Sequence, residues 1–594
     1  MTPLTNGRAA PEELVAPAGP DARPPGEQLS ADQPSADQAP DPPARRTATA
    51  VRQRPERPVW RVAVLVGLLG FALRVWAPGP TSQTVDEFIW TLRAHAFRQA
   101  VVEGDLGRAS TSAVSESNAT QPGVTTMWAG SAGHGLVAAA EALGVVDREP
   151  GLTPRNRARI LRASRSVVSL WCSVALALLL AVSSLLIGRR AAVVAGVVLA
   201  AEPFLVGHSH LLHTDALVTM FGALAVVALA AACRDRRSGP DRRLVVLAGV
   251  AAGVALLTKL NAVPLLLGGA GIGLVAQIDW RHRRRTELRR SALVGAAFLA
   301  VAAATFLVAW PALWVNPWSE LQRLPDSLGH LNDPHPTFFR GAVTTDPGAR
   351  YYLYALAFRS SPWLFVAASG SVAVTVAHLL RGRRPDGGSP WPPRAALLTL
   401  LLAPAPYAVL ITCTGQKYDR YALPVVPFLA LVTGVVVTVA AARWQERFGG
   451  RLLRPAAVVA TAAVVAVTLA AQPFAVSYVN PLVGGQERAR DTILLGWGEG
   501  LEVLGAEILA REGDRCDEVA IAAPNMYPGY VALPCGRFPA GLPVTSYDYV
   551  VRYVAALQRS PRDRFSPAIE RLGRLVKTVE IDGVTYAELW ALDR

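Results

Sequence analysis

Eleven long apolar runs dominate this chain, and short arginine-rich segments separate many of them. A helix needs about 20 apolar residues to cross the hydrocarbon core of a bilayer. The pattern therefore predicts an all-α polytopic membrane protein with about 11 transmembrane helices. The runs lie at roughly 60–77, 166–187, 191–207, 211–232, 244–258, 261–279, 291–314, 362–380, 395–413, 421–441 and 455–473.

The positive charge of the chain follows the same pattern. The formal net charge is +14, which by itself is compatible with nucleic-acid binding. The arginines, however, cluster in short segments between apolar runs, as in cytoplasmic loops of membrane proteins. We therefore predict that the protein has no nucleic-acid partner. We also predict that it lies in the plasma membrane, with its N-terminus in the cytoplasm. Five arginine-rich loops then lie inside: 189–190, 234–243, 281–290, 381–394 and 443–454.

Composition divides the chain into three parts. Residues 1–57 are rich in Pro, Ala, Asp and Gln and predict a disordered cytoplasmic tail. Residues 58–473 hold the apolar runs, with a first extracytoplasmic loop at 78–165. Residues 474–594 turn mixed and polar, with a strand-like run EVAIAA, and predict a small C-terminal α/β extracytoplasmic domain.

The cysteines are too few for a disulfide scaffold. Five are present, and three of them lie in or beside apolar runs, where a cysteine behaves as a small core residue. Cys516 and Cys535 lie in the C-terminal domain. Outside the cytoplasm these two would meet an oxidising environment, so a disulfide between them is predicted.

The pair Asp86–Glu87 follows the first apolar run and the helix-breaking segment Pro78-Gly79-Pro80. Carboxylates beside a bilayer are costly to desolvate and mark a functional site by default. The alternative is an acidic, solvated loop. The predicted topology also brings HSHLLHTDAL to this face, with His208, His210, His213 and Asp215. These histidines are either metal ligands or interfacial side chains, whereas Asp215 joins Asp86 as a functional candidate.

Three cations are predicted on the same face. Lys259 interrupts the stretch 244–279, where two helices should meet at an outside turn, and Lys417 and Arg420 lie in GQKYDRYALP. Each alone could be an interface anchor; together they predict a site for a lipid-linked phosphate. Transfer of a phosphate-linked sugar needs a base or a metal for the acceptor and cations for the leaving phosphate. The arginine-rich segment 155–165 falls on the predicted outside, against the topology pattern. It is either an interfacial helix or a further source of phosphate-binding charge.

An ordered set of short motifs resembles the GT-C superfamily of polytopic glycosyltransferases. The resemblance is to the phospholipid-carrier-dependent branch of protein O-mannosyltransferases and aminoarabinose transferases. The motifs are VDE, the predicted loop segment QPGVTTMW, HTD, LLTKLNAVP, WPALWVNPW, KYDRYALPVVP and YVNPLVGGQERARDTILLGWGEGLE, between about residues 60 and 500.

The resemblance implies an outside-facing cavity, a polyprenyl-phosphate sugar donor and inverting transfer. Asp86 would be the catalytic base or its metal-binding equivalent, supported by Glu87 and Asp215. A divalent metal ion, held by Asp86, Asp215 and more weakly His213, is the one cofactor that the resemblance allows. Lys259, Lys417 and Arg420 would contact the donor phosphate. Gln121-Pro122 replaces the His-Pro of protein mannosyltransferases, which leaves the acceptor open among protein, lipid and envelope glycan.

Two other classes of function compete with an enzyme. A transporter or flippase for a lipid-linked anion should carry internal repeats and broken helices in matching halves. The sequence shows no such repeat, and its polar groups gather at one face. A structural scaffold would leave Asp86–Glu87 without a role. A membrane glycosyltransferase is therefore the preferred interpretation.

Overall fold

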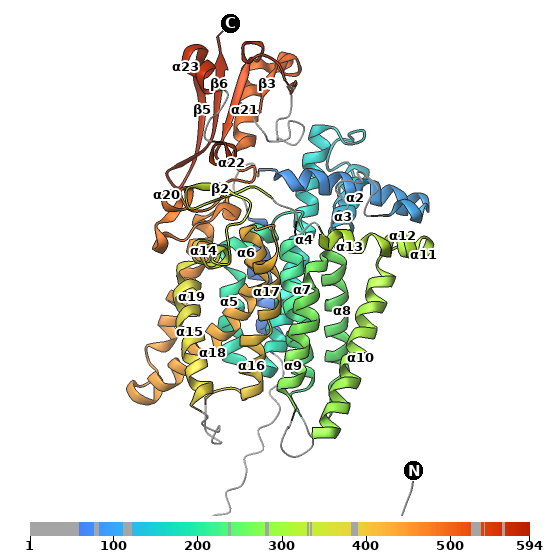
Figure 1. Cartoon of the computed structure of the whole chain (residues 1–594), viewed down its shortest axis with the longest axis vertical. Helices are drawn as coiled ribbons and strands as arrows, with labels where there is room; N and C mark the ends of the chain where they lie inside the picture. The colour runs from blue at the N-terminus through green and yellow to red at the C-terminus, as the bar shows by residue number, and fades with distance from the viewer. Residues whose placement is uncertain are drawn as a thin grey trace, which may run out of the picture. The chain divides into compact units, whose positions relative to one another are not determined.

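The computed structural model describes residues 59–76, 82–110, 122–235, 239–278, 284–329, 332, 335–381, 390–523, 536–539, 541–560 and 565–593. The predicted disordered tail 1–57 lies outside this part of the chain. A helical body comes first, and a small sheet with four short helices follows it (Figure 1). The predicted fold class is thereby confirmed.

Long apolar helices make up the helical body. In the part of the chain that the structure describes, seven helices are long and apolar enough to cross a membrane. The count is eight if the bent pair α5 (Arg189–Ala200) and α6 (Pro203–Ser209) is one span. The helices of the body, which include these seven, are α1 (Trp60–Val75), α4 (Pro154–Ile187), α7 (Asp215–Ala232), α8 (Arg242–Thr258), α9 (Ala270–Ala276), α10 (Arg284–Val308), α15 (Pro362–Leu380), α16 (Arg394–Leu402), α17 (Ala405–Cys413), α18 (Val426–Phe448) and α19 (Leu453–Ala470). The count of eleven stays a prediction, because α1 and α8, with 16 and 17 residues, are only about 24–26 Å long.

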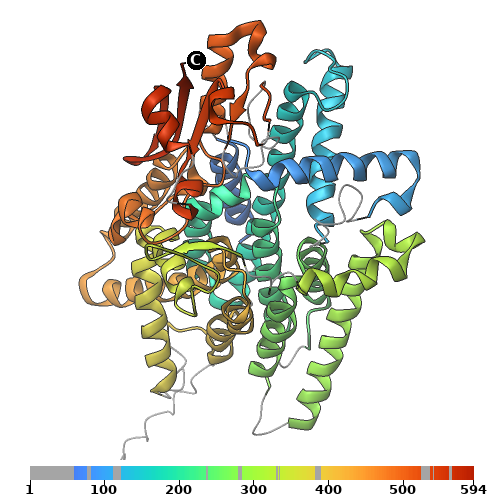
Figure 2. The same cartoon turned by 45° about the horizontal axis from the view of Figure 1, so that its top comes forward.

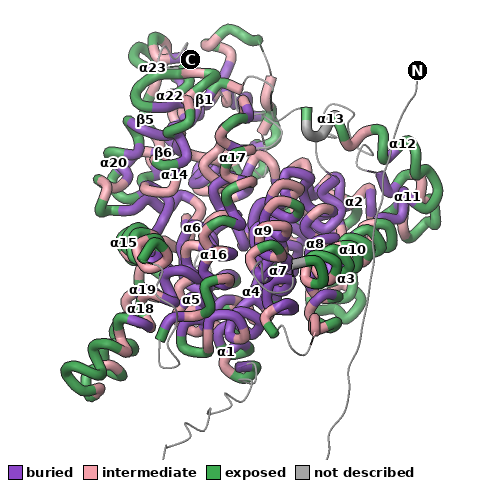
Figure 3. Tube along the Cα trace, turned by 60° about the horizontal axis from the view of Figure 1, so that its bottom comes forward, coloured by how far each residue is buried: buried purple, intermediate pink, exposed green. Residues whose placement is uncertain are grey.

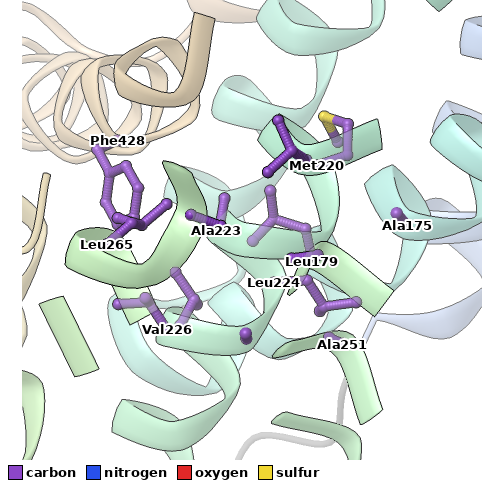
Figure 4. Packing of buried hydrophobic residues seen from close by; sticks show 14 of the residues in the cluster. Ala175, Leu179, Met220, Ala223, Leu224, Val226, Ala251, Leu265 and Phe428 are labelled. Carbon is purple, nitrogen blue, oxygen red and sulfur yellow. The ribbon is translucent and has the colours of Figure 1, made fainter. Parts of the chain in front are cut away.

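Helix α7 is the centre of the body. It is buried along almost its whole length (Figure 3) and packs against α4, α8 and α9. Figure 4 shows its Met220 and Leu224 among Leu179, Leu265 and Phe428. A helix that is apolar on all sides belongs in the interior, and its many alanines let neighbouring helices approach closely. The lateral helices α10 and α19 expose most of their apolar surface.

Two local predictions change in the structure. Residues 155–165 are the first turns of α4, which continues into the apolar span as one helix of 34 residues. Of the segment predicted as a loop at 121–134, residues 124–134 are instead the first part of helix α3 (Val124–Ala142), which begins after Gly123 in the left-handed conformation. The predicted break near Lys259 is present: α8 ends at Thr258, Lys259 is extended, and a π-helical stretch, Pro264–Gly269, leads into α9.

The two ends of the helical body differ. One end carries α2 (Val85–Glu103), the short helices α11 (Ala312–Val315), α12 (Pro317–Gln322), α13 (Leu324–Gly329) and α14 (Tyr351–Arg359), and the C-terminal sheet (Figures 1 and 2). The arginine-rich ends of α8, α10, α15 and α16 lie at the other. Exposed tryptophans mark both ends, as in the aromatic belts of membrane proteins: Trp76, Trp314, Trp318 and Trp363 at the first, Trp60 and Trp444 at the second.

The C-terminal region forms a four-stranded sheet in the order β3-β4-β6-β5. Its strands are β3 (Ile521–Ala522), β4 (Tyr549–Tyr553), β5 (Gly573–Ile581) and β6 (Val584–Leu592), with α20 (Gly485–Arg490), α21 (Leu501–Glu512), α22 (Val554–Arg559) and α23 (Ser566–Leu572) beside or before them. A hairpin of β1 (Thr337–Phe339) and β2 (Ala342–Thr344) touches the start of this region through a bridge from Phe339 to Ile493. Cys516 is buried, but Cys535 lies outside the described residues, so their disulfide stays a prediction.

Candidate active site

The first turn of α2 presents Asp86 and Glu87 in different directions. Thr84 is the N-cap: its hydroxyl accepts from Glu87 N–H at 3.3 Å, and its N–H donates to Glu87 Oε2 at 3.0 Å. This capping box fixes Glu87 against the helix start. Successive residues of a helix point about 100° apart, so Asp86 faces elsewhere.

Glu87 is fully buried by a network of its own. Arg165 of α4 donates to both carboxylate oxygens, with Nε–Oε1 at 2.7 Å and Nη2–Oε2 at 2.6 Å. Leu212 N–H donates to Oε1 at 2.9 Å. Burial opposes ionisation, but Arg165 and the two backbone N–H groups hold the pKa of Glu87 below its ordinary value. Glu87 thus joins α2, α4 and the segment before α7, and all its strong acceptor positions are occupied.

Asp86 is more accessible, with a side chain 32% exposed. Its Oδ2 lies 3.2 Å from His213 Nε2 and 3.5 Å from Arg420 Nη2. Burial alone would raise the pKa of Asp86, but the hydrogen bond with His213 and the charge of Arg420 outweigh it and lower that pKa. The carboxyl is therefore ionised at neutral pH and sits at a helix N-terminus, which favours a negative charge.

Asp215 is the buried counterpart of Asp86. Lys259 Nζ lies 2.8 Å from its Oδ1, and Arg420 Nε lies 3.1 Å from its Oδ2. The second of these is close enough for an ion pair but is not aligned as a hydrogen bond. Arg420 therefore bridges Asp86 and Asp215, and two carboxylates are balanced by two cations.

His213 connects the same two carboxylates. Its Nδ1 accepts from Asp215 N–H at 3.4 Å, so the neutral ring carries its proton on Nε2, toward Asp86. Burial opposes protonation of the ring, but Asp215 and Asp86 raise the pKa of His213 above its ordinary value. Of the three predicted histidines, His213 alone joins this network: His208 Nδ1 lies 3.0 Å from Phe204 O, and His210 is buried near Arg165 and Glu87.

A cavity of about 330 Å³ opens in front of Asp86 and Arg420. That volume is in the range of small-molecule sites in proteins. The helical body supplies most of its charged lining, and the C-terminal region supplies one wall. The lining side chains that carry charge or hydrogen-bonding groups are Asp86, His208, His335, Thr337, Tyr351, Arg359, Tyr418, Asp419, Arg420, Trp497, Glu499 and Arg559.

The structure separates the three predicted phosphate-binding cations. Arg420 lines the cavity. Lys259 is buried between Asp215 and the ring of Tyr421, 4.2 Å from its centroid. Lys417 donates to the carbonyls of Ile411, Thr412 and Thr414 at 3.3, 2.8 and 2.7 Å. These are carbonyls at the end of α17, so Lys417 caps that helix with all three of its protons.

Several site residues were not predicted. Arg359 donates from Nε to Asp419 Oδ2 at 2.7 Å and from Nη1 to Tyr478 O at 2.9 Å. Trp497 and Glu499 enter the cavity from the tail segment LLGWGEGLE, and Arg165 is the partner of Glu87. The motifs already contained Asp419, Trp497 and Glu499 as sequence signals. Arg359 had no such signal. Arg165 lies in the segment 155–165, which was expected to be an interfacial helix or to carry phosphate-binding charge, but its ion pair with Glu87 was not predicted because the two residues are 78 positions apart.

The donor set of the site does not fit a metal ion. Among the described residues, no group of three or more His, Cys, Asp or Glu side chains is arranged to hold one. Asp86 and Asp215, the predicted ligands, face Arg420, and Asp215 also binds Lys259. A divalent cation between them would have to replace the guanidinium.

Part of the chain matches a known family. Residues 161–310 match the family model described as dolichyl-phosphate-mannose-protein mannosyltransferase. This segment includes HTD and LLTKLNAVP, so the resemblance read from the motifs is confirmed there. No curated protein sequence matches this chain.

Two solved proteins are similar to most of this chain at low sequence identity. ArnT from Cupriavidus metallidurans in the apo state is 15% identical, with 89% of this chain and 97% of that chain covered and a TM-score of 0.47. The same protein bound to undecaprenyl phosphate is 17% identical (89% and 96% covered, TM-score 0.43). The Archaeoglobus fulgidus oligosaccharyltransferase tethered with an acceptor peptide is 12% identical (90% and 74%, TM-score 0.44).

The neighbours Asp86 and Glu87 should respond differently to loss of charge. We predict that Glu87→Gln destabilises the fold by about 3–5 kcal/mol, because it leaves Arg165 buried without its counter-charge. Asp86→Asn should cost much less, since Asp86 is partly exposed. Thermal unfolding of the purified protein in detergent measures both. Equal unfolding temperatures for the two variants would contradict this division of roles.

Proposed function

We propose that this protein is a membrane glycosyltransferase that moves a sugar from a polyprenyl-phosphate donor to an extracytoplasmic acceptor with inversion at the anomeric carbon. The observation that carries the proposal is the pairing of an ionised, partly exposed carboxylate with a guanidinium at one cavity wall, Asp86 beside Arg420. The match of residues 161–310 to a family described by a lipid-phosphate-sugar donor supports it.

The two groups divide the chemistry. The acceptor hydroxyl attacks the anomeric carbon from the face opposite the phosphate, and the bond from that carbon to the phosphate oxygen breaks. Asp86 takes the proton of the hydroxyl, and polyprenyl phosphate leaves with the electron pair of the broken bond. Arg420 stabilises the charge that grows on the leaving phosphate. No step needs a metal, and one bound between Asp86 and Asp215 requires Arg420 to move away.

The remaining predicted residues support this pair. Asp215 orients Arg420 and His213, and Lys259 balances the charge of Asp215. His213 donates toward Asp86 and holds its carboxylate in place. Glu87 positions the helix start that carries Asp86. We thus keep Arg420 as the phosphate contact and assign Lys259 and Lys417 to support of the site and of α17.

The site is proposed to face the extracytoplasmic side. The arginine-rich helix ends lie at the end of the helical body opposite α2, which carries Asp86, as the positive-inside rule requires of a cytoplasmic surface. The polar network also gathers at one end of the helices, whereas a transporter would hold its substrate near the midplane. Both observations favour the enzyme over a flippase.

The orientation can be tested with single cysteines in a Cys413→Ser background. Asp346 lies in an exposed loop at the end of the molecule that carries the site, and Arg381 lies at the opposite end, after α15. The two variants are Asp346→Cys and Arg381→Cys. A membrane-impermeant maleimide should label the first variant in intact cells and the second only after permeabilisation. Labelling in the reverse order would overturn the proposed topology.

Loss of the Asp86 charge should abolish transfer. We expect Asp86→Asn to lower the rate of sugar transfer by about 10²–10⁴-fold, the usual contribution of a general base. The assay uses purified protein with polyprenyl-phosphate sugars chosen from mass spectrometry of envelope glycans and glycoproteins in a deletion strain. The control is Asp105→Asn, which removes the charge of an exposed carboxylate near the end of the same helix. Unchanged transfer by Asp86→Asn would reject Asp86 as the base.

Substitutions of Arg420 and Lys417 should have different effects on the kinetics of transfer, because the two cations occupy different places in the structure. Arg420→Ala should weaken both donor binding and turnover, because the guanidinium faces the cavity. Lys417→Ala should lower the unfolding temperature and leave the KM for the donor within about 3-fold, since its protons cap α17. Initial rates at varied donor concentration distinguish the two. A large rise in KM for Lys417→Ala alone would restore Lys417 as the phosphate contact.

A further inference from the structure

The segment Gly496-Trp497-Gly498-Glu499-Gly500, the GWGEG loop, forms part of the cavity wall that the C-terminal region supplies, through Gly496, Trp497 and Glu499. Its three glycines have φ angles of +82°, +122° and +87°. Residues with side chains rarely adopt these angles. At Gly498 a side chain is also excluded by space, because a Cβ there would lie 2.5 Å from Gln83 O. The loop is therefore built to lie against the residues that precede α2.

Hydrogen bonds hold this loop on two sides. Tyr553 of β4 accepts from Gly498 N–H at 2.8 Å and donates to Glu499 Oε2 at 2.9 Å. On the other side, Gly500 N–H donates to Ser82 Oγ at 2.9 Å, two residues before the N-cap of α2. The C-terminal sheet and the helix that carries Asp86 are thus joined through one short loop.

Trp497 is the residue that this loop places in the cavity. The guanidinium carbon of Arg420 lies 4.3 Å from the centroid of the Trp497 ring and 4.0 Å from that of Tyr418. The Trp497 ring also meets His213 edge-on, with centroids 5.1 Å apart. A flat guanidinium against aromatic faces is restricted in rotation while its edge stays free for ion pairs. Its edge is the part that reaches Asp86 and Asp215.

We propose that Trp497 is a positioning residue for sugar transfer: its ring fixes the Arg420 guanidinium in the orientation that bridges Asp86 and Asp215. This inference rests on the proposed function, because it names how the phosphate-stabilising cation is held. It also gives the C-terminal region a role in the reaction. Loss of the ring frees Arg420 to rotate without removing any group that reacts.

Three substitutions test the proposal at Trp497. Trp497→Leu should lower kcat/KM at least about 10-fold, because the aromatic face is lost. Trp497→Phe keeps a face and should recover most of that loss. Trp590→Leu removes a tryptophan of β6 that lies away from the cavity and serves as the control for lost packing. Equal activity of the Leu and Phe variants, at equal unfolding temperatures, would overturn the proposal.

A double-mutant cycle shows whether Trp497 acts through Arg420. In an Arg420→Lys background, which keeps the charge but has no flat face to stack, Trp497→Leu should cost less than about 3-fold. If the fold-losses caused by Trp497→Leu and Arg420→Lys simply multiply, Trp497 acts independently of Arg420, which contradicts the proposal. If Trp497→Leu fails to fold, Tyr418→Leu removes the other ring from a different segment and should show the same coupling.

Failure of this inference can be told apart from failure of the proposed function. If the effects of Trp497→Leu and Arg420→Lys multiply and Asp86→Asn is inactive, the role of Trp497 is rejected but the proposed transferase activity stands. Full activity of Asp86→Asn rejects the assigned chemistry itself, whatever the cycle gives.

Discussion

The candidate site depends on the buried ion pair between Glu87 and Arg165. It joins the capped start of α2, the first turns of α4 and the backbone of Leu212, three segments that are distant in sequence. A buried carboxylate is stable only when its charge and its lone pairs are satisfied, and here both are. The pair therefore sets where α2 begins. Because Asp86 is the preceding residue, it also sets where Asp86 points and how near it lies to His213 and Arg420.

Charge balance is the second constraint on the site. Asp86 and Asp215 are matched by Arg420 and Lys259, so the resting site carries little net charge apart from His213. Lys259 neutralises the buried carboxylate, which leaves Arg420 at the cavity. In the proposed reaction, the phosphate of the lipid donor shares the guanidinium with the carboxylates, and no buried charge is left unpaired. The GWGEG loop adds an aromatic face to the same guanidinium, which ties the C-terminal region to this balance.

Much of the site could be predicted from the sequence, since Asp86, Asp215, His213, Lys259 and Arg420 were all expected at one face and do form one network. Lys417 lies three residues from Arg420, yet its protons go to backbone carbonyls of α17. No sequence pattern shows which carbonyls a helix end leaves unpaired in space. The same limit hid the pairing of Arg359 with Asp419 and of Arg165 with Glu87, since these partners lie 60 and 78 positions apart.

The sequence by itself determined the class of the fold and predicted the residues that meet at one end of the helical body. Apolar length selects membrane helices, and the arginines predict their orientation, because both are effects of solvent on local stretches of chain. Only the tertiary structure decided which of two adjacent carboxylates faces the cavity and which is buried, and which of three cations is exposed there. Those outcomes depend on contacts between segments that are far apart in the chain, and hydrogen-bond geometry in the folded state settles them.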